Sequence, residues 1–182
     1  SVDYEPVWIF YRKNTFNEGI HVSDRDIAKL RINIGAVGSG THTQALSILK
    51  QNHLNPTARN LLSMNNSDAV NAIERGEIDA VFLVDGYDSP NVQRLIKNPN
   101  IRLVTFTRAD AYARLLPYFE ELAVPMGGFD LGNNIPDHPI QLISTTTNLL
   151  IDDRLHPAIQ VLFLEAAKEI NGAKSYFSKA GE

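Results

Sequence analysis

Residues 31–49 of the chain, RINIGAVGSGTHTQALSIL, decide the fold. A short apolar run that includes Ile32 and Ile34 leads into a glycine-rich turn, after which apolar residues recur at helical spacing as far as Leu49. This order predicts a strand, a tight turn and a helix in direct succession. Because strands that alternate with helices build sheets covered by those helices, the stretch indicates an α/β fold.

The glycine turn itself contains Gly38-Ser39-Gly40-Thr41. Glycine lets the backbone approach a ligand closely, and the first N–H groups of a helix lack intrahelical partners and lie at the positive end of its dipole. The hydroxyl groups of Ser39 and Thr41 add two donors. We therefore predict an anion site at Ser39, Gly40 and Thr41, with the alternative that either hydroxyl caps the helix and the turn binds nothing.

Two features missing from the turn restrict the kind of anion. A phosphate-cleaving loop of the Walker type has a Lys before its Ser or Thr, and Gly40 stands at that position. The dinucleotide pattern G-x-G-x-x-G fails as well, because Thr43 occupies the place of the third glycine. A small carboxylate or similar anion, held by neutral donors, therefore fits better than a nucleotide.

The composition is that of a globular protein with one ordinary domain or two small lobes. The chain has 182 residues, of which 43% are apolar and 21% charged, and its net charge is −4. This acidic balance, with basic residues scattered along the chain, argues against nucleic acid and anionic membranes as partners. The sequence contains no cysteine, which excludes disulfides, thiolate metal sites and cysteine nucleophiles.

The rest of the chain alternates between apolar runs and helical patterns. Strands are predicted at 7–11, 58–64, 78–84, 101–106 and 140–151, an extended segment at 122–128, and helices at 41–52, 67–75, 90–98, 107–116 and 157–170. The alternation predicts a mainly parallel sheet with helices on both faces. Ligands in such sheets lie at the carboxyl ends of strands, so segments 85–89 and 107–110 are further candidates.

Six short stretches stand out, in this order: YEPVWIFYR (4–12), GSGT (38–41), GEIDAVF (76–82), RADAYA (108–113), TNL (147–149) and LHPA (155–158). Together they resemble the TAXI family of TRAP-transporter solute receptors over nearly the whole chain. The resemblance implies a type 2 periplasmic-binding-like fold of two α/β lobes joined by strand crossovers. Such a receptor holds a small organic anion, such as glutamate or a dicarboxylate, in its cleft and delivers it to a membrane permease.

The same resemblance implies that the sequence starts at the first crossover, without the family's N-terminal lobe and export signal. It divides the chain into a first crossover strand and loop (1–30), a ligand-binding lobe (31–129) and a return crossover with a C-terminal helix (130–182). That helix would pack on the missing lobe, so we expect it to pack on this lobe or on a second chain as a dimer. The implied location is periplasmic or extracytoplasmic, with a membrane anchor of the full-length protein left open.

Four more residues are candidates for the ligand site: Tyr4, Tyr87, Arg108 and Asn148. Tyr4 lies near the crossover in the family pattern, and Tyr87 could reach the cleft or be an exposed loop residue. Arg108 could clamp a carboxylate with two hydrogen bonds or simply be solvated in the first turn of a helix. Asn148, inside an apolar strand, needs a hydrogen-bond partner that could be the ligand or the protein.

No residue pattern in the sequence supports catalysis. The five histidines share no metal-ligand spacing, and neither H-E-x-x-H nor G-x-S-x-G occurs. We therefore predict a binding protein without metal or cofactor rather than an enzyme. Two alternatives stay open: a ligand-sensing domain of the same fold attached to a membrane or signalling module, and a scaffold that has lost its ligand.

Overall fold

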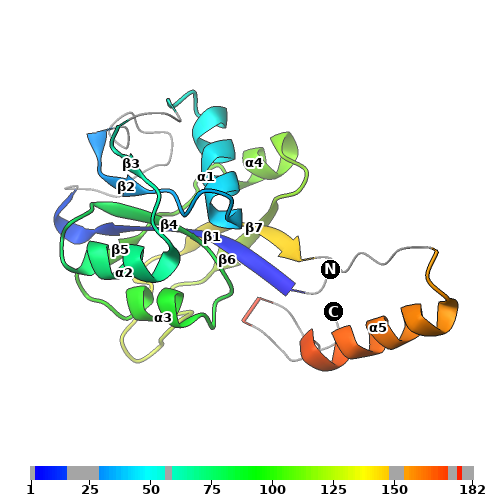
Figure 1. Ribbon diagram of the computed structural model, residues 1–182. Helices are drawn as coiled ribbons and strands as arrows, with labels where there is room; N and C mark the ends of the chain where they lie inside the picture. The colour runs from blue at the N-terminus through cyan, green and yellow to red at the C-terminus, as the bar shows by residue number, and fades with distance from the viewer. Residues whose placement is uncertain (1–2, 16–28, 56–58, 148–153, 172–175, 178–182) are drawn as a thin grey trace.

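The computed structural model describes residues 3–15, 29–55, 59–147, 154–171 and 176–177. The strands are β1 (Asp3–Arg12), β2 (Ile32–Asn33), β3 (Leu61–Leu62), β4 (Ala80–Val84), β5 (Ile101–Leu103), β6 (Glu120–Val124) and β7 (Ile140–Thr147). The helices are the 3₁₀ turn η1 (Lys13–Thr15), α1 (Gly40–Gln51), α2 (Asn66–Glu74), α3 (Pro90–Ile96), α4 (Ala109–Leu115) and α5 (Pro157–Asn171). The sheet separates α1 and α4 on one face from α2 and α3 on the other (Figure 1).

All seven described strands belong to one sheet, in the order β3-β2-β4-β1-β7-β6, with β5 also paired to β1. Strand β2 is parallel to β3 and β4. Strand β1 is antiparallel to β4, β5 and β7, and β6 is antiparallel to β7. Five of the seven strands therefore run in one direction, which confirms the predicted mostly parallel α/β architecture. The reversed strand β1 in the middle of the sheet was not predicted.

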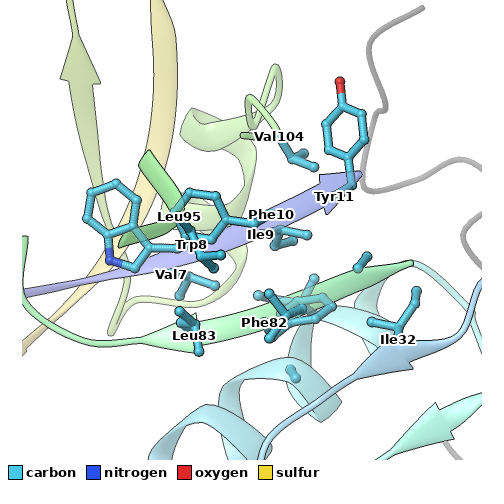
Figure 2. Packing of buried hydrophobic residues seen from close by; sticks show 14 of the residues in the cluster. Val7, Trp8, Ile9, Phe10, Tyr11, Ile32, Phe82, Leu83, Leu95 and Val104 are labelled. Carbon is cyan, nitrogen blue, oxygen red and sulfur yellow. The ribbon is translucent and has the colours of Figure 1, made fainter. Parts of the chain in front are cut away.

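The apolar run of β1 forms the centre of the core. Val7, Trp8, Ile9 and Phe10 are each at most 3% exposed, because helices cover both faces of the sheet and alternate side chains are buried on each side. Figure 2 shows these side chains against Phe82 and Leu83 of β4 and Leu95 of α3. Burial of each large side chain of this kind stabilises the fold by about 1.5–3 kcal/mol.

Strands β5 and β7 share one side of β1, and this arrangement redirects the chain after β5. Strand β5 pairs with Phe10–Arg12, whereas β7 pairs with Asp3–Val7. The N–H of Phe106, beyond the end of β5, donates to the carbonyl of Gln141 at 2.8 Å, beside the start of β7. Segment 107–110 therefore does not reach the edge where β4 ends, and its expected place at that edge is wrong.

Helix α5 extends away from the sheet (Figure 1). The predicted helix is present, but its apolar side chains face solvent: Leu162 is 63% exposed, and Ile159, Val161, Phe163 and Leu164 are also exposed. We expected this helix to pack on its own lobe or on a second chain. The described part of its own lobe does not cover it. Strands from all three predicted segments (1–30, 31–129 and 130–182) enter the same sheet.

Candidate ligand-binding site

An open pocket of about 590 Å³ lies where β2, β3 and β4 end. It is lined by Glu5, Ala36, Ser39, Gly40, Thr41, Asn65, Asn66, Ser67 and Val84. Apart from Glu5, these residues come from the carboxyl ends of parallel strands or from the starts of the helices that follow them. That is the position at which open α/β sheets bind ligands.

The start of α1 forms one wall of the pocket. Ser39 caps the helix, because its Oγ accepts a hydrogen bond from the N–H of His42 at 3.1 Å. In the described residues, no protein acceptor meets the N–H groups of Gly40 and Thr41, the first two of the helix. The cap thus arises from Ser39, while two backbone donors at the positive end of the helix stay available to a ligand.

Thr41 has a structural contact as well as a place in the pocket. Its side chain is only 4% exposed, and its Oγ1 accepts a hydrogen bond from the N–H of Val84 at 3.1 Å. This bond ties the first turn of α1 to the end of β4. Since the hydroxyl accepts that bond, its own hydrogen can still be donated.

The start of α2 forms the opposite wall. Oδ1 of Asn65 accepts from the N–H of Asp68 at 2.9 Å and caps the helix. Within the described part of the chain, the N–H groups of Asn66 and Ser67 meet no protein acceptor. Two helix N-termini therefore converge on one pocket, although sequence reasoning did not place residues 65–67 there. The predicted parallel strand that ends at Met64 was the signal that could have found them.

Two glycines before α1 give the turn its shape. Gly35 has φ +87°, and a Cβ atom there would lie 2.8 Å from Thr41 Cβ and 2.9 Å from the His42 nitrogen. Gly38 has φ +85° but open space around it. The tightest packing of the turn against the protein itself is thus at Gly35, whereas the expected close approach of a ligand at Gly38 and Gly40 stays a prediction. A Cβ atom added at Gly40 would have no other atom within 4 Å, so there is free space beside this residue.

Three of the predicted site residues lie together and three others do not line the pocket. Ser39, Gly40 and Thr41 are adjacent at the start of α1. Arg108 lies at the other end of that helix, where Nη2 donates to Oδ1 of the C-cap residue Asn52 at 3.0 Å. A counter-charge role for Arg108 in this pocket is therefore not supported.

Tyr87 and Tyr4 are not among the residues that line the pocket. The ring of Tyr87 packs against Phe129 and Tyr176, with ring centroids 5.3 Å and 4.5 Å away. Tyr4 precedes the lining residue Glu5, and successive side chains of a strand lie on opposite faces of the sheet. Asn148 lies outside the described residues.

The segment after β4 is held by local hydrogen bonds. The carboxylate of Asp85 accepts from the Gly86 N–H at 2.9 Å and from the Ser89 hydroxyl at 2.6 Å. The indole Nε1 of Trp8 donates to the Asp85 carbonyl at 2.9 Å. These contacts explain Asp85 as a turn-forming residue and leave it outside the pocket lining.

Charge in the pocket comes from one side chain and two helix ends. Among the described residues that line the pocket, Glu5 is the single charged one, and none is Lys, Arg or His. The described carboxylates with a lowered pKa lie elsewhere; for example, a hydrogen bond from Arg31 lowers the pKa of Asp79. In the part of the chain that the structure describes, no three His, Asp or Glu side chains are placed to hold a metal ion.

Comparison with known proteins assigns the sequence to a family. The sequence profile described as the NMT1-like family matches residues 8–175, which is most of the chain. The chain belongs to the NMT1-like family. No curated protein sequence matches this NMT1-like chain significantly.

Solved structures share the fold of this NMT1-like protein at low sequence identity. The periplasmic aliphatic sulphonate binding protein SsuA from Escherichia coli has a TM-score of 0.51 and 15% identity, over 92% of this chain and 43% of SsuA. An ancestral arginine-binding protein bound to arginine has a TM-score of 0.47 and 13% identity, over 96% of this chain and 58% of that one. The effector binding domain of QuiR in complex with shikimate has a TM-score of 0.47 and 10% identity, over 93% of this chain and 63% of that one.

The name of SsuA describes it as a binding protein for aliphatic sulphonates. The NMT1-like chain has the α/β fold of a periplasmic-binding-protein lobe, and it spans 43% of the length of SsuA. Among its described helices, none combines the length and the apolar character needed to cross a bilayer.

Proposed function

We propose that this chain is the ligand-binding lobe of an extracytoplasmic solute-binding protein for a small organic anion. The convergence of two helix N-termini on one pocket carries the proposal. Four lining residues at the starts of α1 and α2, namely Gly40, Thr41, Asn66 and Ser67, have backbone N–H groups that meet no acceptor among the described residues. Such donors and the positive ends of two helix dipoles favour a carboxylate or a related anionic group.

In this proposal the anion binds chiefly to backbone. Gly40 and Thr41 supply N–H groups from α1, and the hydroxyl group of Thr41 donates its hydrogen. Ser39 acts mainly by capping the helix that carries these donors. The start of α2 supplies the matching N–H groups from the other wall. A role for Asn148 stays a prediction.

The family resemblance supports one type of transporter. Membership of the NMT1-like family and the fold of a sulphonate-binding protein support a solute-binding role. The TAXI-like stretches favour a TRAP-type permease as the membrane partner and glutamate or a dicarboxylate as the ligand. The predicted dimer through α5 also stays a prediction, for which the exposed side chains of that helix are available.

The test is a pair of matched glycine substitutions. Gly40 lines the pocket and Gly86 does not, while a Cβ atom at either position meets nothing within 4 Å. Gly40→Val should fill space beside the free N–H groups and weaken binding, whereas Gly86→Val should leave binding unchanged. Both variants should fold.

Binding is measured by NMR titration of the ¹⁵N-labelled chain with L-glutamate, 2-oxoglutarate and succinate. We expect the amide signals of residues 40, 41, 66 and 67 to shift in the wild type and in the Gly86 variant. The same affinity in Gly40→Val would disprove the assigned site.

A further inference from the structure

The outer edge of β6 carries backbone groups that face away from the sheet. Among the described strands, β6 is the last of the sheet and pairs with β7 alone. Gln141 of β7 lies opposite Ala123 of β6. Its N–H donates to Thr105 Oγ1 at 2.9 Å and its carbonyl accepts from the N–H of Phe106 at 2.8 Å, so both groups point away from β6. Because bonded and non-bonded pairs alternate in an antiparallel ladder, the backbone groups of Ala123 and Glu121 face outward.

These outward groups are open over a short stretch of the edge. Turns close its two ends, where the N–H of Phe119 and the carbonyl of Pro125 make local hydrogen bonds. Between them, the N–H and C=O groups of Glu121 and Ala123 have no hydrogen-bond partner among the described residues. The edge thus offers two donors and two acceptors, to which an extended chain can add as a further strand.

Exposed apolar side chains flank the same edge. Outside α5, the described residues include five exposed large apolar side chains, of which one is Val37. The other four lie in the segments that directly precede and follow β6, and they are Leu115, Tyr118, Met126 and Leu131. Met126 is 56% exposed and Tyr118 46%. Free backbone groups and apolar side chains therefore occur together here, as at surfaces that bind another chain.

The charge of this edge selects its occupant. Residues 115–147 contain no Lys or Arg, and their carboxylates are those of Glu120, Glu121, Asp130 and Asp137. Glu120 and Glu121 are exposed, and none of the ion pairs among the described residues includes them. A second copy that paired antiparallel through the same free groups would place the two Glu121 side chains diagonally across one face, which their like charges disfavour. A basic segment would meet opposite charge instead.

We propose that the outer edge of β6 is a docking site for an extended, basic segment of a partner protein. The segment adds as a further strand, with its backbone on Glu121 and Ala123 and its Lys or Arg side chains beside Glu120 and Glu121. Strands β7 and β1 separate this edge from β4, β2 and β3, whose ends form the anion pocket. Docking at β6 is therefore independent of the proposed function.

Peptide titrations of the ¹⁵N-labelled chain test the inference. The probe is acetyl-Lys-Val-Thr-Val-Lys-amide, and the controls are the same peptide with Glu in place of Lys and the same peptide with N-methylated backbone amides. We expect the basic peptide to shift the amide signals of Glu121 and Ala123 and to slow their hydrogen exchange. Each control should bind about tenfold or more weakly, because one has like charge and the other lacks backbone donors.

Substitutions at Ala123 separate docking from folding. Since the Ala123 N–H makes no ladder bond, a proline there keeps the pairing with β7 and blocks the outer edge. Ala123→Pro should retain the thermal unfolding midpoint and weaken peptide binding by about tenfold or more, whereas Ala123→Val keeps the N–H and should bind as the wild type does. The double change of Glu120→Gln and Glu121→Gln should remove the preference for the basic peptide. Asp88→Asn, at an exposed carboxylate beyond β4, should retain that preference.

Three results would overturn the inference. The first is equal binding of the basic and acidic peptides, and the second is unchanged binding in a folded Ala123→Pro variant. The third is a wild-type dimer in sedimentation velocity that Ala123→Pro dissociates, because the edge would then hold a second copy. If Ala123→Pro does not fold, the N-methylated peptide decides in the wild type: binding as tight as that of the probe overturns the inference, and lost binding supports it.

Discussion

Replacing Gly35 by Ala should disrupt the start of α1 more than any other glycine change in its turn. A Cβ atom at this position would lie 2.8 Å from Thr41 Cβ and 2.9 Å from the His42 nitrogen, closer than real Cβ contacts. The backbone also has φ +87°, a conformation that costs an L-residue about 1–2 kcal/mol. Forcing a methyl group into filled space costs about 1–3 kcal/mol more, so we expect a loss of about 2–5 kcal/mol in unfolding free energy.

Two neighbouring glycines separate these two costs. Gly38 has φ +85° but free space, so Gly38→Ala should lose only the backbone cost of about 1–2 kcal/mol. Gly40 has neither constraint, and Gly40→Ala should be neutral or stabilise the protein by up to about 1 kcal/mol through a less flexible unfolded chain. The expected order of stability is therefore Gly40→Ala, wild type, Gly38→Ala and Gly35→Ala.

Urea unfolding followed by tryptophan fluorescence gives these free energies, because Trp8 is the single tryptophan and is fully buried. If the unfolding free energies of Gly35→Ala and Gly38→Ala differ by less than about 0.5 kcal/mol, the predicted steric cost of a methyl group beside Thr41 is refuted.

Three further predictions concern other contacts. Thr41→Val should lower the unfolding free energy by about 1–3 kcal/mol, because the Val84 N–H loses its acceptor; urea unfolding should show a smaller loss for Thr41→Ser, and equal losses would contradict the role of the hydroxyl. The hydrogen bond from Arg31 lowers the pKa of Asp79 below its ordinary 3.8, so its stabilisation is complete above that pH and is lost as the pH falls through the lower, folded-state pKa. Urea midpoints of wild type and Asp79→Asn should therefore converge on acidification, and a gap that persists at the lowest pH would refute this. Leu162→Glu should change the unfolding free energy by less than about 0.5 kcal/mol, because this side chain is exposed, and should prevent any association seen by sedimentation of the wild type; a clear loss of stability would show instead that α5 packs on its own lobe.

Most of the elements could be predicted because their signals are local. The 3.6-residue period, the caps and the proline at the start of α3 are properties of neighbouring residues. The direction of β1 could not be predicted in this way. A strand buried on both faces has the same apolar run whether its neighbours are parallel or antiparallel, so VWIFY does not reveal its orientation.

The same difference between local and long-range properties decides which residues of the candidate site could be predicted. Ser39, Gly40 and Thr41 were found because one turn of sequence contains them. Arg108 was misplaced because its position depends on β5 and β7 sharing one side of β1, which is a long-range property. Glu5 was missed since its place in the pocket depends on where β4 stops along β1.

The central position of β1 also affects how the protein is made. This strand leaves the ribosome before β4, β5 and β7, and it pairs with all three. Pairing between segments so far apart in sequence is slow. Until β7 has been synthesised, the Asp3–Val7 half of β1 has no permanent partner on the side that β7 later occupies, and it can pair with other chains. We therefore expect truncations before residue 147 to aggregate, and the nascent chain to depend on factors that bind unfolded segments.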